Sequence, residues 1–250
     1  MSAVTDPVEN SYSYHEHQHH IHGDPHKRGS GLADVILGGQ DGLVNVLGII
    51  LGMAAATGDN YLVIVAGLSA TFAESISMAA VAYTSTLADS DYYESERARE
   101  YRHIQEVPNL ERTEIQDLYY RKGFRGELLE RIVATITENE DVWVAVMMAE
   151  EHQLTPTDRK QAMRSAVIVG FSAIIGSLLP LLPFFFLPIQ ASMILSVLIT
   201  ALALFFTGVY KARIMVGRPV RSGLEMALIG TVSALAGYLI GLLLKAPPGS

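Results

Sequence analysis

The sequence predicts an all-α integral membrane protein with five transmembrane helices and a cytoplasmic, helical metal-binding insert between helices 2 and 3. Half of the 250 residues are hydrophobic, only 18% are charged, and the mean hydropathy is +0.27. Five apolar runs, at about 33–57, 61–88, 165–187, 190–210 and 224–245, each reach the roughly 20 residues that cross a hydrocarbon core. Residues 89–158, between runs 2 and 3, hold 17 acidic and 8 basic side chains.

This pattern divides the chain into four segments. We expect a disordered tail over 1–30, transmembrane helices 1 and 2 over 31–88, the acidic insert over 89–160 and transmembrane helices 3–5 over 161–250. The chain contains no Cys, which excludes disulfides and thiolate metal sites. The tail lacks the apolar segment of a signal peptide, so the first helix is expected to direct insertion. A lipid bilayer is the expected surrounding, and no nucleic-acid partner is expected.

The tail is rich in histidine. Its low content of apolar residues predicts disorder. Two interpretations stay open, a weak metal-collecting tail and a solvated segment without a role. The histidines are His15, His17, His19, His20, His22 and His26.

The distribution of Lys and Arg predicts the orientation in the membrane. The short connections at 58–60 and 187–190 contain neither residue type. The tail, the insert and the loop after run 4 carry them, and Lys245 alone departs from the pattern. The tail and the insert are therefore predicted to be cytoplasmic.

Runs 1 and 2 carry ionisable residues inside apolar sequence, which is costly in a membrane and indicates a functional site. Asp41 and Asn45 share one helical face in run 1 with two glycines. Such a face is expected to point into a helix bundle or across a dimer interface. Glu74 and Met78 share a face in run 2. These four residues are the candidate transport path.

Runs 3 and 5 indicate packing rather than chemistry. Pro180 and Pro183 predict a bent or broken helix near the non-cytoplasmic end of run 3. Run 5 presents a face of small residues that is typical of close helix packing. These residues are Gly230, Ala234, Gly237 and Gly241.

The insert is predicted to be helical over about 90–106, 108–122, 126–137 and 140–153. The first of these helices is expected to continue out of run 2. Pro108 is typical of a helix start and Gly123 of a helix end, and the last helix is expected to close before Pro156. A compact helical unit of this kind can direct side chains from several helices to one point.

Candidate metal ligands occur in the insert at helical spacing. Two pairs are three residues apart, one of them an E-x-x-H, and a third pair is four apart. Carboxylates and imidazole suit Fe2+, Mn2+ or Zn2+, and a thioether argues against Mg2+ or Ca2+. The spacing alone leaves open that the carboxylates form a solvated helix face and that the methionines belong to the core. The candidates are Glu100, His103, Glu111, Glu114, Met147, Met148 and Glu151.

Several stretches together resemble the vacuolar iron transporter family. They are D-G-L-V-N in run 1, A-E-S-I-S-M-A-A in run 2, the acidic helical insert after run 2, and P-L-L-P-F-F in run 3. The resemblance extends from about Leu32 to Leu244 and leaves out the tail.

The resemblance implies a homodimer of five-helix subunits with a metal path between the subunits. Fe2+, and also Mn2+, would leave the cytoplasm in exchange for protons, with Co2+ and Zn2+ as further candidate substrates. The family's intramembrane Asp and its helix-two Met correspond to Asp41 and Met78. Its insert ligands correspond to the seven candidates given above.

The chain departs from the family pattern at two places. The plant pattern has Glu where His103 stands, which lowers the negative charge of the cluster. Many relatives have G-E-Y after S-M-A-A, whereas this chain has Val81-Ala82-Tyr83. Glu74, two turns earlier, is either a substitute for that carboxylate or a structural hydrogen-bonding group.

We therefore expect a transporter that is not an enzyme, in which the insert captures metal and Asp41 alternately binds metal and proton. The expected location is the vacuolar membrane in a eukaryote and the plasma membrane in a prokaryote. The alternative is a membrane-anchored ferroxidase or iron store that uses the insert. A complete site of that type has two E-x-x-H pairs, of which the insert offers one. A membrane scaffold would leave Asp41 and Glu74 unexplained.

Overall fold

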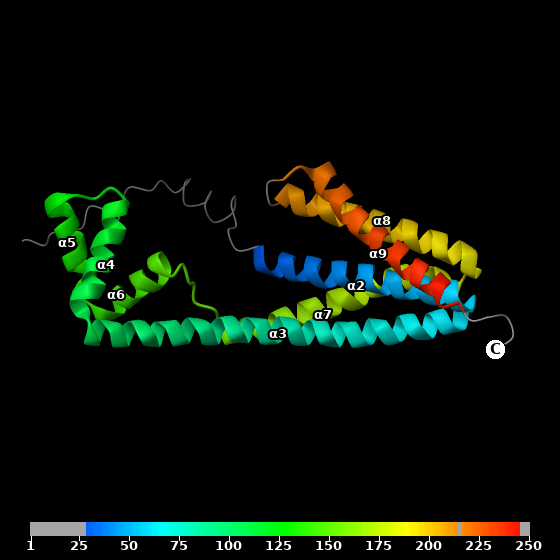
Figure 1. The fold of residues 1–250 in the computed structure, drawn as a ribbon, viewed down its shortest axis with the longest axis horizontal. Coiled ribbons are helices and arrows are strands. Elements are labelled where there is room, and N and C mark those ends of the chain that lie inside the picture. Colours follow the sequence, from blue (N-terminus) through cyan, green and yellow to red (C-terminus); the bar gives the residue numbers. More distant parts are fainter. Residues whose placement is uncertain (1–28, 215–216, 246–250) are drawn as a thin grey trace, which may run out of the picture. The chain divides into compact units, whose positions relative to one another are not determined.

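The computed structural model describes residues 29–214 and 217–245, and within them the secondary structure is helical (Figure 1). The predicted tail lies outside the described residues except at 29 and 30, where the first helix begins. The elements are α2 (Gly29–Thr57), α3 (Asn60–Glu106), α4 (Pro108–Arg121), α5 (Gly126–Thr137), α6 (Glu140–Val146), the π-helical segment η1 (Met147–Glu151), α7 (Arg159–Leu181), the 3-10 segment η2 (Leu182–Phe185), α8 (Ile189–Ile214) and α9 (Pro219–Leu243).

Five of these helices are long and apolar enough to cross a membrane, as predicted. They coincide with the five apolar runs, and α3 continues without a break from its apolar part to Glu106. The insert helices begin and end within a few residues of their predicted bounds. Gly123, with φ +104°, follows the end of α4, where the left-handed conformation favours glycine.

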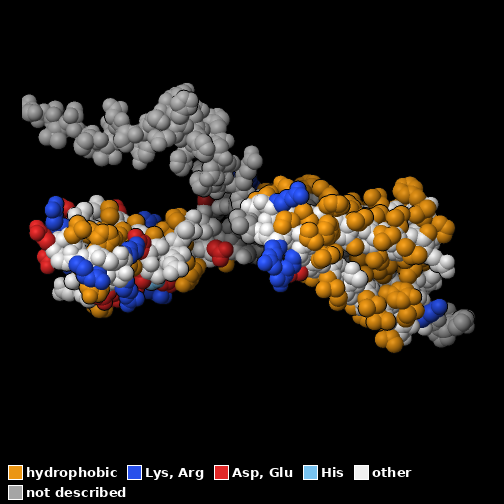
Figure 2. Space-filling view, turned by 90° about the horizontal axis from the view of Figure 1, so that it is seen from above, with side chains coloured by type: hydrophobic (Ala, Val, Ile, Leu, Met, Phe, Trp, Pro, Cys, Tyr) orange, Lys and Arg blue, Asp and Glu red, His pale blue; other side chains and the backbone are white. Residues whose placement is uncertain are grey.

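The chain forms two compact units. Unit 1 comprises residues 1–72 and 171–250, and unit 2 comprises residues 73–170. Hydrophobic side chains cover the face of α8 and α9 in unit 1 that Figure 2 presents. In unit 2, Lys and Arg are mixed with Asp and Glu over the surface of α4–α6 (Figure 2). Unit 1 therefore has the surface of a membrane domain, and the insert has the surface of a domain in water.

Glycines bring α2 and α9 into close contact within unit 1. A Cβ on Gly237 would overlap the carbonyl of Gly48, and one on Gly241 would overlap the carbonyl of Gly52. The predicted small-residue face of run 5 is thus a packing face, and its partner is the first transmembrane helix of the same chain. Small residues permit this approach in a membrane, where helices associate through close packing.

The third transmembrane helix is broken near its end, as its prolines predicted. α7 ends at Leu181 and the chain continues as the 3-10 segment η2. Proline removes backbone donors, so carbonyls near the break need other partners. α8 supplies them: the Ser196 hydroxyl donates to the Pro180 carbonyl at 2.5 Å, and the Ser192 hydroxyl donates to the Pro183 carbonyl at 3.1 Å.

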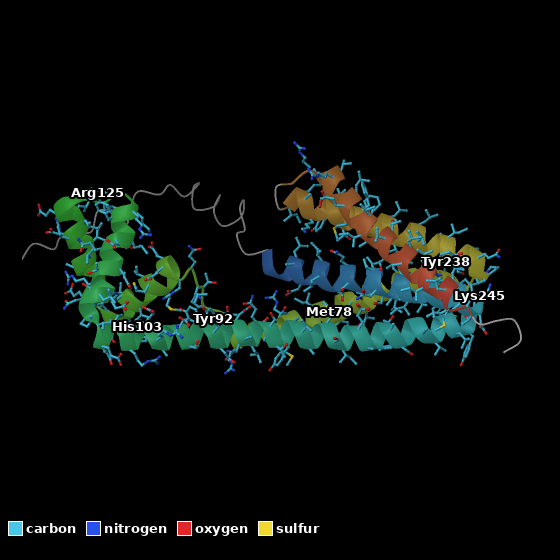
Figure 3. The ribbon with its side chains drawn as sticks, viewed as in Figure 1. Met78, Tyr92, His103, Arg125, Tyr238 and Lys245 are labelled. Carbon is cyan, nitrogen blue, oxygen red and sulfur yellow. The ribbon has the colours of Figure 1, made fainter. Side chains whose placement is uncertain are left out.

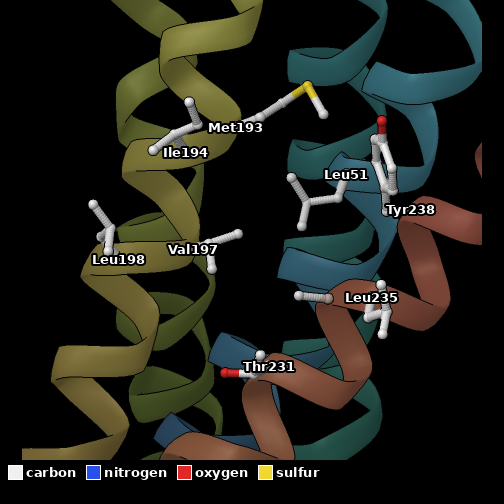
Figure 4. A pocket seen from close by; sticks show the side chains of 9 residues that line it. Leu51, Met193, Ile194, Val197, Leu198, Thr231, Leu235 and Tyr238 are labelled. Atoms are coloured by element: carbon white, nitrogen blue, oxygen red, sulfur yellow. The ribbon is translucent and has the colours of Figure 1, made fainter.

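An apolar cavity of about 380 Å³ opens between α2, α8 and α9 (Figure 4). Leu51, Val197 and Tyr238 are among its lining residues. Its described lining includes no Asp, Glu, His, Lys or Arg. A cavity of this composition suits hydrocarbon and gives no site for an ion.

Candidate metal centre

The candidate ligands of unit 2 are brought together where α3 turns back into α4. Only Val107 separates the two helices, and its N–H donates to the His103 carbonyl at 2.8 Å. Pro108 starts α4, because proline needs no backbone partner in the first turn. The tight connection places Glu111, in the first turn of α4, beside the last turns of α3. His103 is labelled on α3 in Figure 3.

Glu100, His103 and Glu111 each direct one ligand atom to a common point. These three atoms lie within 4.8 Å of one another. The Nδ1 of His103 is 3.4 Å from Oε1 of Glu111 and 4.0 Å from Oε1 of Glu100. Atoms bound to one ion at about 2.1 Å each are about 3–4.2 Å apart. The two pairs that include His103 fall within this range, as the ligands of a single divalent ion would.

Both carboxylates of this group are buried. The side chains of Glu100 and Glu111 are each 3% exposed, whereas that of His103 is 43% exposed. Oε2 of Glu100 and Oε2 of Glu111 are buried, and among the described residues neither has a hydrogen-bond partner. A buried carboxylate oxygen without a partner is costly, and a bound cation would remove that cost.

The pKa shifts in this group also favour a bound cation. Burial, followed by the negative charges of Glu114 and Glu100, raises the pKa of Glu111 to about 7. Burial and the charge of Glu114 also raise the pKa of Glu151. Glu114 and Glu151 thus lie close enough to repel the buried carboxylates. A divalent cation among these groups would turn mutual repulsion into attraction.

Met147 and Met148 are buried in the apolar core of the same unit. Each is 1% exposed and packs in an apolar core with Ile115, Val133 and Trp143. The core alternative that the sequence left open accounts for these contacts. Their role as metal ligands stays a prediction.

His152 is a member of the cluster that the sequence reasoning missed. Its Nε2 lies 3.0 Å from Oε1 of Glu100. A signal was available, because His103 and His152 are the only histidines outside the tail. Glu150, by contrast, pairs with Lys122 and accepts from the Tyr119 hydroxyl at 3.3 Å.

The predicted transport-path residues lie on α2 and α3. On α2, in unit 1, Asp41 is half-buried and Asn45 is exposed. On α3, in unit 2, Glu74 and Met78 are half-buried, and Figure 3 labels Met78. Next to Asp41, Gly42 packs so closely on α7 that a Cβ would meet the Ala173 carbonyl and the Ser177 hydroxyl. The proposed pairing of these four residues along one path stays a prediction.

A search against protein families matches residues 32–242 to the model of the VIT family. The chain belongs to the VIT family. The match covers all five spans and the insert, and it confirms the family that the sequence motifs indicated.

Individual relatives agree with this assignment. The chain is 34% identical over 224 residues to "Vacuolar iron transporter 1" of Oryza sativa subsp. japonica, covering 89% of each chain. It is 30% identical over 239 residues to "Vacuolar iron transporter 1" of Tulipa gesneriana, covering 95% of this chain and 94% of that one. A "Vacuolar iron transporter" of Plasmodium falciparum is 28% identical over 244 residues, which is 92% of this chain and 89% of that one. This VIT-family chain is therefore a multi-pass membrane protein similar to iron transporters along nearly its whole length.

Proposed function

We propose that this VIT-family protein moves Fe2+, and also Mn2+, out of the cytoplasm across a membrane in exchange for protons. The observation that carries the proposal is the buried pair Glu100 and Glu111, which lies beside His103 and of which each carboxylate has one buried oxygen without a partner among the described residues. The relatives named above are iron transporters. A protein with that function needs a group that binds a divalent cation and helices that span the membrane, and this chain has a candidate for each. The metal is the cargo, and the cluster is where the cargo is captured.

The cluster chemistry supports a first-row divalent ion as substrate. Two carboxylates and one imidazole suit Fe2+, Mn2+, Co2+ or Zn2+, whereas Mg2+ and Ca2+ prefer oxygen ligands alone. The half-exposed imidazole of His103 lies beside buried Glu100 and Glu111. An ion arriving from water would therefore meet the imidazole at the open side and the carboxylates further in.

In the membrane, Asp41 is proposed to carry the exchange. A carboxylate that binds either a proton or a metal gives antiport directly, because both cations compete for the same oxygens. Asn45, Met78 and Glu74 are proposed to complete the path, which would lie between the two subunits of a homodimer. The distribution of Lys and Arg supports a cytoplasmic insert. The membrane would be vacuolar in a eukaryote and the plasma membrane in a prokaryote.

A ferroxidase or iron store has less support. A di-iron site of the ferritin type uses two E-x-x-H pairs and two further Glu. Residues 89–160 contain one E-x-x-H, formed by Glu100 and His103. The three-residue group found among the described residues fits a single ion.

The test is a flux experiment in proteoliposomes. Fe2+, Mn2+, Co2+ and Zn2+ are added outside vesicles with an acidic or a neutral lumen, and entry of each metal is followed. Fe2+ entry that is faster with the acidic lumen and accompanied by alkalinisation of that lumen is expected. Metal entry at the same rate with an acidic and a neutral lumen would refute the exchange. Oxygen consumption with Fe2+, without Fe2+ entry, would favour the ferroxidase.

A further inference from the structure

The backbone around His152 departs from regular helix. The His152 N–H donates to the Met147 carbonyl, five residues earlier, at 3.1 Å, which makes η1 a π-helical turn. The next residue, Gln153, has φ +55°, in the left-handed region that a side chain other than that of glycine rarely adopts. One extra residue in a turn rotates the side chains that follow by about 100° about the helix axis. Wide turns and strained residues of this kind recur at functional sites.

His152 uses this position to contact the carboxylate of Glu100. Its Nε2 is 3.0 Å from Oε1 of Glu100, and its side chain is 29% exposed. Where this contact is a hydrogen bond to an ionised carboxylate, which can only accept, Nε2 is the donor. Oε1 of Glu100 is thereby engaged, while Oε2 is buried and has no partner among the described residues.

His152 stands outside the group that could share one ion. The three ligand atoms that lie within 4.8 Å of one another come from Glu100, His103 and Glu111. His152 contacts only Glu100, through Oε1, the oxygen that also lies 4.0 Å from Nδ1 of His103. A residue in this place acts on the metal through the ligand that it holds.

We propose that His152 is a positioning residue, whose Nε2–H fixes the orientation of the Glu100 carboxylate toward the divalent metal. The proposal rests on the proposed function, in which the insert captures metal. Neither the family match nor the names of the relatives assign this role to His152.

The test measures Mn2+ binding by the full-length protein in detergent, because Mn2+ is stable in air and its free form is read directly by electron paramagnetic resonance. Four variants are compared with the wild type: His152→Ala, His152→Gln, Glu100→Gln and, as a matched control from the exposed segment that follows, Thr155→Ala. The amide nitrogen of Gln can occupy the place of Nε2 and donate the same hydrogen bond. Fluorescence of Trp143, the one Trp of the chain, shows that each variant keeps its folded core.

We expect His152→Ala to raise the Kd for Mn2+ by roughly 10–100-fold, as removal of such outer partners does elsewhere. His152→Gln should restore most of the affinity, and Thr155→Ala should match the wild type. Pulsed resonance spectra should show the same nitrogen coupling to Mn2+, from His103, in the wild type and in both His152 variants.

Three results would overturn the proposal. If His152→Ala binds Mn2+ as the wild type does, His152 has no positioning role. If His152→Gln is as weak as His152→Ala and both lose a nitrogen coupling, His152 is itself a ligand. If Glu100→Gln also leaves binding unchanged, metal capture at this cluster fails as a whole, which separates that failure from the failure of the His152 role alone.

Discussion

The Nδ1 of His103 lies 3.4 Å from Oε1 of Glu111, although the two residues belong to different helices. The contact exists because the connection between α3 and α4 is a single residue, Val107. This contact joins the half-exposed imidazole of His103 to the buried carboxylate of Glu111, whose Oε2 has no partner among the described residues. The candidate metal centre is thus located at a helix corner, where rigid elements would hold ligands in place more firmly than loops.

Glu111→Gln should have opposite effects on stability and on metal binding. Without metal at pH 8, it removes a buried, repelled charge and should stabilise unit 2 by about 1–3 kcal/mol. It should also weaken Mn2+ binding at least 10-fold, because an amide oxygen is a poorer ligand than a carboxylate. Both are measured on the full chain with chelator or Mn2+, through Trp143 fluorescence during unfolding. A variant that is less stable without metal would contradict the electrostatic account.

The stability of the metal-free insert should fall as pH rises. The pKa of Glu111 is about 7 in the folded chain against an ordinary value of 4.5, so the folded state holds the proton more tightly than the unfolded chain does. The free energy of unfolding is therefore highest below about pH 4.5 and decreases until about pH 7, by at most about 3 kcal/mol for this group. Glu151, whose pKa is also raised, acts in the same direction.

Urea unfolding of the full chain at several pH values, followed by Trp143 fluorescence with chelator present, measures this slope. The Glu111→Gln variant is the control and should show a flatter profile. Stability that increases between pH 4.5 and 7 would refute the assigned direction.

Gly237→Ala should destabilise the transmembrane unit. Its Cβ would overlap the Gly48 carbonyl, and overpacking of this kind costs about 1–3 kcal/mol. Gly31→Ala is the matched control, because a Cβ on Gly31 meets nothing within 4 Å. Thermal melting in detergent should show a lower midpoint for Gly237→Ala alone. Equal midpoints for the two variants would mean that α2 and α9 are not closely packed.

Asn139→Ala should loosen the helix that leads to η1. The side-chain oxygen of Asn139 accepts from the N–H groups of Asp141 at 2.9 Å and Val142 at 3.2 Å. Loss of such a cap costs about 1 kcal/mol, and Asn139→Asp should retain it. Urea unfolding followed by Trp143 fluorescence compares the two variants. The cap would be discounted if Asn139→Ala and Asn139→Asp unfolded at the same urea concentration.

The elements of the fold could be predicted because each has a local cause. Apolar runs longer than a bilayer is thick specify the spans, and Pro108 and Gly123 mark the ends of α4 in any context. The break at the prolines of run 3 has a local cause, and the hydrogen bond from Ser196 of α8 to the Pro180 carbonyl comes from a distant part of the sequence. That the glycines of run 5 face those of run 1 could not be predicted, because a face of small residues does not indicate which helix packs against it.

The candidate site could be predicted only in part, for a geometric reason. Glu100 and His103 lie three residues apart on one regular helix, so their shared face could be predicted, whereas Glu111 comes from the next helix and joins them through the short connection at Val107. His152 follows a π-helical turn, where spacing rules for a regular helix fail, and so its contact with Glu100 was not anticipated. The methionines were ambiguous from the outset, because a buried thioether serves a core and a metal equally well.

The central claim is tested most directly by proton-driven Fe2+ entry into proteoliposomes that contain Asp41→Asn. Asn is similar in size but cannot exchange a proton for a metal. The matched control is Asp59→Asn: Asp59 accepts from the Tyr61 N–H at 2.7 Å at the start of α3, and Asn caps a helix equally well. We predict that Asp41→Asn loses Fe2+ entry and its coupled proton efflux while still binding Mn2+ at the insert, and that Asp59→Asn keeps both. Fe2+ entry at the wild-type rate in Asp41→Asn would contradict the account.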